Sequence, residues 1–217
     1  MNFLQAATGN YKRGRTSTIK YIVIHYTANN GDTAKGNANY FHNNKNLKAS
    51  AHYFVDEKEI WQAVRDEDTA YHCGATKYKH KECRNSNAIG VEMCSRKDGN
   101  GRYYIKEETV QNAIALTKEL MAKYDIPASR VLRHYDVTGK SCPEPFVRQP
   151  VQWERFKSLL AKQEVQEVKK QIKIKLNGKE KQVTAIESGG YNYVKLQDLR
   201  DDKIEIGYDG VPIVKVK

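Results

Sequence analysis

Short apolar runs recur along the first hundred residues, and their composition is that of β-strands. Residues 19–26 are mostly β-branched or aromatic with little alternation, which is typical of a strand buried on both faces of a sheet. Residues 51–55 and 59–64 predict two strands that a polar turn joins into a hairpin. Residues 88–94 predict a further core strand, whereas the polar, non-periodic segment 71–87 predicts a long loop.

Between and after these strands, the apolar positions change to a helical spacing. In residues 106–124 they recur at i, i+3, i+4 and i+7, which predicts an amphipathic helix. Two shorter segments, 33–43 and 152–160, predict further helices, the first with Thr33 as its N-cap. Because predicted strands and helices alternate, we expect an α/β domain over residues 1–162, with a mixed central β-sheet flanked by helices.

The composition changes at the end of this domain. Residues 163–170 are rich in Gln, Glu and Lys and predict a linker. In residues 171–217, predicted strands flank Asn177-Gly178 and again Asp209-Gly210, and both dipeptides favour hairpin turns. With a short helix expected near 195–199, this segment predicts a small C-terminal β-rich module of ββαββ type. A module of that size buries little core of its own.

The net charge of +11 favours polyanionic partners such as nucleic acid, an anionic membrane or an anionic wall polymer, although a solvated basic surface explains it equally well. Residues 1–162 hold 26 basic and 17 acidic side chains and residues 163–217 hold 11 and 9, so most of the excess lies in the first domain. No reading helix or stacking platform supports a nucleic-acid partner. No run of about 18 apolar residues supports a membrane span.

Two further features concern the site of synthesis and the redox state. Residues 1–10 have neither a charged start nor a long apolar stretch, so we expect no signal peptide and synthesis in the cytoplasm. The cysteines form no CxxC pair and are not densely spaced, which argues against a disulfide framework and a zinc ribbon. The four cysteines are Cys73, Cys83, Cys94 and Cys142.

Three residues that can bind metal follow apolar runs. His25 ends the first predicted core strand, His134 follows the apolar pair Val131-Leu132, and Cys142 comes eight positions later. Taken singly, each histidine is more often a satisfied core or strand-end residue, and a lone cysteine is usually a small buried hydrophobe. Together, two imidazoles and one thiolate form a set of three protein ligands typical of catalytic zinc, with the fourth position left to water.

Five motifs that occur in order along the chain carry a resemblance to a known family. They are IVIHYT (22–27), AHY (51–53), AYHCG (70–74), NAIGVE (87–92) and HYDVTGKSCP (134–143). This set resembles the zinc-dependent N-acetylmuramoyl-L-alanine amidases of type 2, which include phage endolysins, T7-type lysozyme and the peptidoglycan recognition proteins. The resemblance covers roughly residues 19–160 and implies an amidase-like or peptidoglycan-recognition-like fold.

The resemblance also implies roles for individual residues. Glu92 matches the acidic residue that acts as general base in one branch of the family, and Lys140 matches a lysine that assists catalysis in the T7-type branch. That branch has a catalytic tyrosine where this chain has Ala51, so the mechanism with Glu92 fits better. The implied zinc ligands are His25, His134 and Cys142.

Contacts to substrate and to the ligands are predicted as well. We expect His72, in the polar loop, to touch the sugar or the peptide, although a plain loop histidine is an equal alternative. Tyr53 and Asn87, from two of the motifs, are the other predicted substrate contacts. Asp136 is expected to orient His134 as a hydrogen-bond partner.

The resemblance implies hydrolysis of the amide between N-acetylmuramic acid and L-alanine in peptidoglycan, by a phage endolysin or an autolysin that needs Zn²⁺. A non-catalytic peptidoglycan-binding module is the alternative. We expect peptidoglycan and anionic wall polymers as partners, reached after a holin-type release. Residues 171–217 loosely resemble the small stalk-like modules of secreted clostridial proteins, and we expect them to bind the wall or, failing that, to mediate self-association.

Overall fold

The computed structural model describes residues 1–161, 168–176, 178–188, 191–200, 203–208 and 212–216. The chain divides into two compact units, Met1–Lys162 and Gln163–Lys217, and each is described by itself. No helix in the described residues is long and apolar enough to cross a lipid bilayer.

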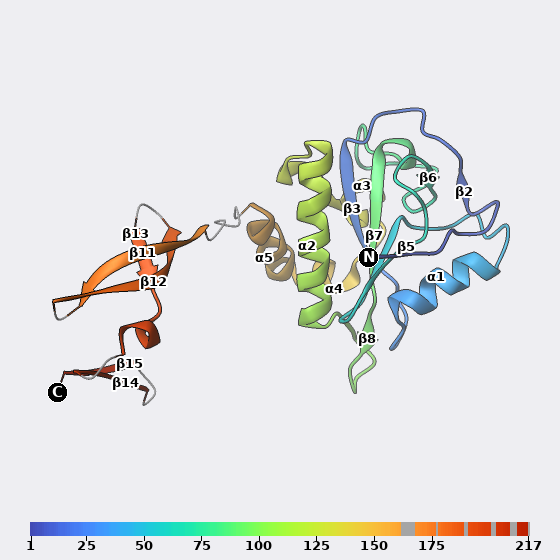
Figure 1. The fold of residues 1–217 in the computed structure, drawn as a ribbon. Helices are drawn as coiled ribbons and strands as arrows, with labels where there is room; N and C mark the ends of the chain where they lie inside the picture. The colour runs from blue at the N-terminus through green and yellow to red at the C-terminus, as the bar shows by residue number, and fades with distance from the viewer. Residues whose placement is uncertain (162–167, 177, 189–190, 201–202, 209–211, 217) are drawn as a thin grey trace. The chain divides into compact units, whose positions relative to one another are not determined.

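A six-stranded mixed sheet forms the centre of the first unit, as expected (Figure 1). In spatial order its strands are β1 (Asn2–Phe3), β5 (Ile60–Gln62), β4 (Tyr53–Val55), β7 (Ala88–Met93), β3 (Tyr21–Tyr26) and β10 (Val131–Arg133). Strands β4 and β5 pair antiparallel as the predicted hairpin, and the other neighbours pair parallel. The apolar runs at 19–26 and 88–94 become β3 and β7, which lie side by side with His25 opposite Glu92.

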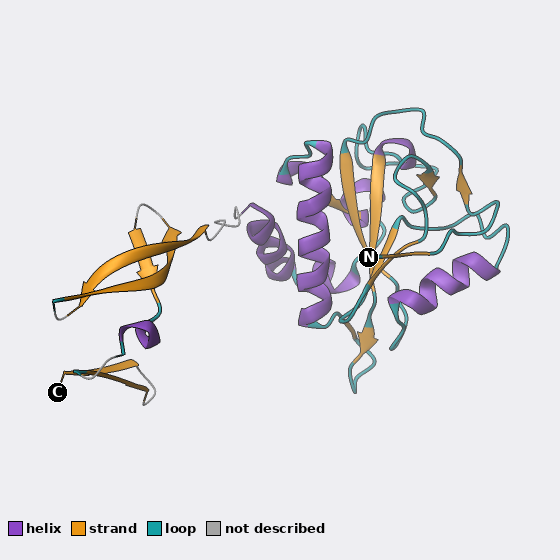
Figure 2. Ribbon diagram, viewed as in Figure 1, coloured by secondary structure: helices purple, strands orange, loops and turns teal. Residues whose placement is uncertain are grey.

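Helices cover both faces of the sheet (Figures 1 and 2). Helices α2 (Glu107–Tyr124) and α5 (Pro150–Ala161) pack on one face of the sheet. On this face, Ile22 and Ile24 of β3 form the main core together with apolar side chains of both helices. On the other face, α1 (Ala34–Asn43) packs over Phe54 of β4. The hydroxyl of Thr33 accepts a hydrogen bond from the Gly36 N–H, so the predicted N-cap is confirmed.

Alternation along the strands determines which residues are left for a site. In β3 the even-numbered residues face α2, so His25 lies on the opposite face. In β7 the odd-numbered residues Ile89, Val91 and Met93 enter the main core, which leaves Gly90 and Glu92 on the same face as His25. The register of the parallel strands therefore brings His25 and Glu92 together.

Several short elements were not predicted. Residues after β10 form α3 (His134–Thr138) and α4 (Glu144–Arg148), so His134 lies at the start of a short helix. The remaining elements of the first unit are β2 (Tyr11–Lys12), β6 (Thr69–Ala70), η1 (Asn85–Asn87), β8 (Arg96–Lys97), β9 (Tyr103–Tyr104) and η2 (Ala128–Arg130).

The second unit is β-rich but differs from the predicted ββαββ pattern. It contains β11 (Val168–Leu176), β12 (Lys179–Ser188), β13 (Tyr191–Val194), η3 (Leu196–Leu199), β14 (Ile204–Tyr208) and β15 (Pro212–Val216). The first three strands form one antiparallel sheet and the last two another. The segment before η3 is thus a third strand, and β11 begins inside the segment predicted as linker. Asn177 and the turn at Asp209-Gly210 lie outside the described residues.

Candidate active site and metal centre

His25 is the centre of the site. Its side chain is buried, and its two ring nitrogens face different neighbours. Nδ1 lies 3.7 Å from the Cys142 Sγ and 3.9 Å from a carboxylate oxygen of Glu92. Nε2 lies 3.0 Å from Nδ1 of His72. The Nδ1 side of the ring is therefore the side on which a metal ion can be shared with Cys142.

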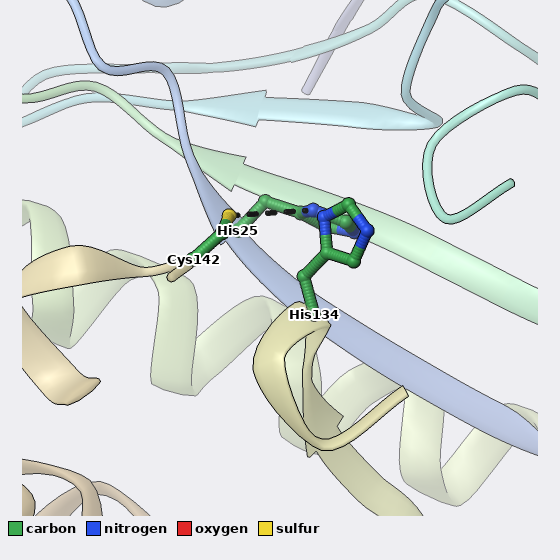
Figure 3. Close-up of side chains that lie close together, drawn as sticks. All are labelled: His25, His134 and Cys142. Carbon is green, nitrogen blue, oxygen red and sulfur yellow. Dashed lines mark hydrogen bonds between the residues drawn. The ribbon is translucent and has the colours of Figure 1, made fainter. Parts of the chain in front are cut away.

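His134 and Cys142 reach His25 from the segment after β10 (Figure 3). The centroids of the His25 and His134 rings are 4.7 Å apart. The loop that carries Cys142 is joined to α3, because its carbonyl accepts a hydrogen bond from the Tyr135 N–H at 2.9 Å. One ligand atom from each of His25, His134 and Cys142 lies within 4.8 Å of the others.

The chemistry of this cluster fits a metal ion such as zinc. Burial lowers the pKa of His25 well below its ordinary value and that of His134 to about 4, so both imidazoles are neutral and offer lone pairs. The contact of His25 with Glu92 is accordingly not an ion pair. Nδ1 of His134 is buried without a hydrogen-bond partner. Burial raises the pKa of the Cys142 thiol to about 12, but a bound cation deprotonates a coordinating thiol.

Glu92 supplies a carboxylate next to these three residues. Burial raises its pKa to about 8, Lys140 opposes the rise and Asp32 adds to it. One carboxylate oxygen is buried and has no hydrogen-bond partner. A carboxylate with a pKa in this range can both accept and return a proton near neutral pH.

Two open clefts meet beside the cluster. One, here called the lysine cleft, has a volume of about 860 Å³, and the other, the aromatic cleft, about 640 Å³. Both are in the range of ordinary ligand sites. They share Tyr71, His72 and Lys140 in their walls. The lysine cleft is also lined by His134 and the aromatic cleft by Glu92, so the cluster lies where the two clefts join.

His72 is held between the sheet and the clefts. Asn85 Oδ1 accepts hydrogen bonds from the backbone N–H groups of His72 and Cys73, at 3.2 and 2.8 Å. The ring lies against Gly90, where a Cβ atom would meet its Cγ at 2.6 Å. Neither Asn85 nor Gly90 was singled out from the sequence. An isolated glycine inside a predicted strand was the available signal for Gly90, because it often marks a close approach.

Two residues predicted as substrate contacts line neither cleft and make other contacts. Tyr53 is 3% exposed and packs in the main core, and its hydroxyl donates a hydrogen bond to Asp66 at 2.6 Å. Asn87 lines neither cleft, and its side chain accepts from the Arg84 N–H and donates to the Glu82 carbonyl. Tyr53 thus stabilises the core and Asn87 the loop.

The predicted partnership of Asp136 with His134 is also replaced by another contact. Both carboxylate oxygens of Asp136 accept hydrogen bonds from Arg133, at 2.8 to 3.1 Å, including one from its backbone N–H. This interaction caps the N-terminus of α3, the helix on which His134 is the first residue. Asp136 therefore positions His134 through the backbone.

Residues 15–145 match the sequence model of a family described as N-acetylmuramoyl-L-alanine amidase. A probable N-acetylmuramoyl-L-alanine amidase of Bacillus licheniformis is 40% identical over 150 residues, which cover 66% of this chain and 41% of that protein. The amidase BlyA of Bacillus subtilis (strain 168) is 32% identical over 174 residues, covering 74% and 43%. Among solved structures, the catalytic domain of XlyA superposes with a TM-score of 0.59 at 30% identity, covering 74% of this chain and 99% of that one.

The mixed sheet flanked by helices places the chain in the same structural class as the catalytic domain of XlyA. Because the family match covers more than half of its residues, the chain belongs to the N-acetylmuramoyl-L-alanine amidase family. The resemblance drawn from the five motifs is confirmed. The match lies within the first unit, and the chain spans about two fifths of the length of the first curated relatives.

Proposed function

We propose that the first unit hydrolyses the amide bond between N-acetylmuramic acid and L-alanine in peptidoglycan, with zinc held by His25, His134 and Cys142. The convergence of these three ligand atoms within 4.8 Å, where two clefts join, is the observation that carries the proposal. AmiD of Escherichia coli offers a further argument. Its structure, with a TM-score of 0.50 and 26% identity, holds the substrate anhydro-N-acetylmuramic acid-L-Ala-D-γ-Glu-L-Lys. We propose a substrate of the same kind for this chain.

Each residue of the site has a defined task in this reaction. A zinc ion, when bound, supplies a Lewis acid that lowers the pKa of water to about 7 and polarises the scissile carbonyl. Glu92 takes the proton of the attacking water and passes it to the leaving amine of L-alanine. The Lys140 ammonium stabilises the negative charge that develops on the carbonyl oxygen. His72 holds the ring of His25 through Nε2, so that Nδ1 stays directed at the metal position.

Analysis of the cleavage products tests the activity. Purified peptidoglycan treated with the full chain should gain free N-terminal alanine without new reducing sugar ends. Wall binding without release of alanine would favour the alternative, a non-catalytic peptidoglycan-binding module.

Zinc content tests the ligand set. Cys142→Ser should remove most of the zinc and the activity, whereas Cys83→Ser should retain both. Cys83 is also a buried free thiol, but it lines neither cleft and thus serves as the matched control. A fully active preparation free of metal would refute the zinc assignment.

For the second unit we propose binding to the cell wall, with self-association as the second candidate. Strand β11 carries Lys170, Lys173 and Lys175, and ammonium groups suit anionic wall polymers. A chain that ends at Ala161 should cleave soluble muramyl peptides but pellet less with intact walls, because two linked sites bind with higher effective affinity than one. Self-association would instead appear in gel filtration as an oligomer of the full chain and a monomer of the shortened chain. Equal pelleting with walls, together with the same oligomeric state for both chains, would contradict both candidates.

A further inference from the structure

The two clefts differ in charge and in apolar character. The lysine cleft is lined by Lys48, Lys77 and Lys140, and no acidic residue lines it in the described part of the chain. The aromatic cleft is lined instead by Tyr40, Phe41 and Phe54 and by two carboxylates, those of Asp32 and Glu92. The site therefore has one cationic arm and one arm with aromatic rings and acidic groups.

The proposed substrate is asymmetric in the same way. On one side of the scissile amide is an N-acetylated sugar, whose lactyl carboxyl is consumed in the amide and carries no charge. On the other side is the stem peptide. Its glutamate is linked through the γ-carboxyl, so the α-carboxylate is free, and a second free carboxylate ends the peptide. The anionic groups thus lie on the peptide side of the bond.

We infer that the lysine cleft binds the stem peptide through its free carboxylates, with Lys48 and Lys77 as the residues that select for them, and that the aromatic cleft binds the sugar. This inference rests on the proposed function. Lys140 is excluded from the selecting pair because it lies in both clefts and has a task at the reacting carbonyl.

The surroundings of the two lysines support this orientation. Lys48 and Lys77 are exposed residues of separate loops, and no ion pair engages either of them within the described residues. Their ammonium groups are free to meet a carboxylate that enters the cleft. The opposite orientation would bring the stem carboxylates close to Asp32, and like charges repel.

The aromatic cleft suits an uncharged sugar for a different reason. Tyr40 is 52% exposed although it is a large aromatic residue, and its ring packs edge-on against Phe41. An exposed aromatic ring in a cleft wall offers an apolar surface with a polar tip. Asn29 and Asn37, which also line this cleft, carry amide oxygens that can accept hydrogen bonds from hydroxyl and acetamido groups.

The consequence is a preference between stem peptides. A stem whose glutamate α-carboxylate is free should bind better than one in which this group is an amide. Because both lysines are exposed, each contact is expected to contribute a modest factor, roughly two- to fivefold in KM, that decreases with salt.

The test uses the zinc-loaded full chain and two soluble substrates, N-acetylmuramyl-L-Ala-D-γ-Glu-L-Lys and the same compound with both stem carboxylates amidated. Lys48→Gln, Lys77→Gln and the double variant should raise KM for the acid substrate, about 4- to 25-fold for the pair, with kcat unchanged. The amidated substrate should be cleaved equally by wild type and variants. Lys45→Gln and Lys81→Gln, exposed lysines of the same two loops that line neither cleft, are the controls.

Several results would overturn the inference. An equal effect of the variants on both substrates, or an effect as large in the controls, would show that the lysines do not read the stem carboxylates. Weaker wall binding with an unchanged acid-to-amide ratio would assign the lysines to an anionic wall polymer. If wild type cleaves neither substrate, the proposed function fails. Calorimetric titration of wild type and the lysine variants with the two compounds then still measures whether Lys48 and Lys77 favour the acid compound over the amidated one.

Discussion

Gly90→Ala tests whether the contact between His72 and His25 organises the site. Gly90 lies in the middle of β7, and an added Cβ would lie 2.6 Å from Cγ of His72 and 2.9 Å from Cδ2 and Nδ1. Ordinary contacts begin at 3.4 Å, so the ring has to withdraw by about 0.8 Å. Gly90 does not have a positive φ, so the strain is steric.

The displaced ring has two consequences. Overpacking of a buried site typically costs about 1–3 kcal/mol, which we expect as the loss in free energy of unfolding. The hydrogen bond between Nδ1 of His72 and Nε2 of His25 is 3.0 Å long and does not tolerate a shift of this size. Loss of such an outer partner typically weakens metal binding by about 10- to 100-fold.

Urea unfolding of the zinc-free protein measures the first effect, and competition with a chromophoric chelator measures the second. Gly74→Ala and Gly99→Ala are matched controls, because the nearest atom to a new Cβ is 3.5 Å away at Gly74 and none lies within 4 Å at Gly99. In the His72→Ala background the cost of Gly90→Ala should largely disappear, since the clashing ring is gone. If Gly90→Ala unfolds and binds zinc like the controls, His72 does not position His25.

Three further results are expected. Glu92→Gln should retain zinc but lower kcat about 100-fold or more, and near-normal turnover would shift the role of general base elsewhere. Tyr53→Phe should lower the free energy of unfolding by about 1 kcal/mol, because the hydrogen bond to Asp66 is lost. KM should stay unchanged, and a raised KM would show that the Tyr53 hydroxyl contacts the substrate. A backbone hydrogen bond and Lys106 lower the pKa of Glu57 to about 2. Ionised Glu57 should therefore stabilise the protein fully above its unfolded pKa, and this contribution should be lost as the pH falls toward 2. The melting temperatures of Glu57→Gln and wild type should differ at pH 7 and converge near pH 2, and a constant difference would refute the assignment.

Patterns within the chain determined most of the regular structure. The apolar runs of β3 and β7 and the periodicity of α2 are local properties, because a strand or helix face repeats every two or 3.6 residues. The motif residues His25, His134 and Cys142 were also predicted together, and the structure brings them within reach of one ion. Such a combination of side chains indicates a metal site even without coordinates, since few functions other than metal binding need two imidazoles and a thiol.

Only the tertiary structure decided which motif residues face the clefts. Tyr53 and Phe54 are adjacent in one strand, and packing of α2 and α1 on opposite faces determined that Tyr53 enters the core. His72 meets His25 across 47 residues, and Lys48 and Lys77 come from separate loops to one cleft. Such contacts depend on how loops pack over a sheet, and no short-range periodicity records that packing.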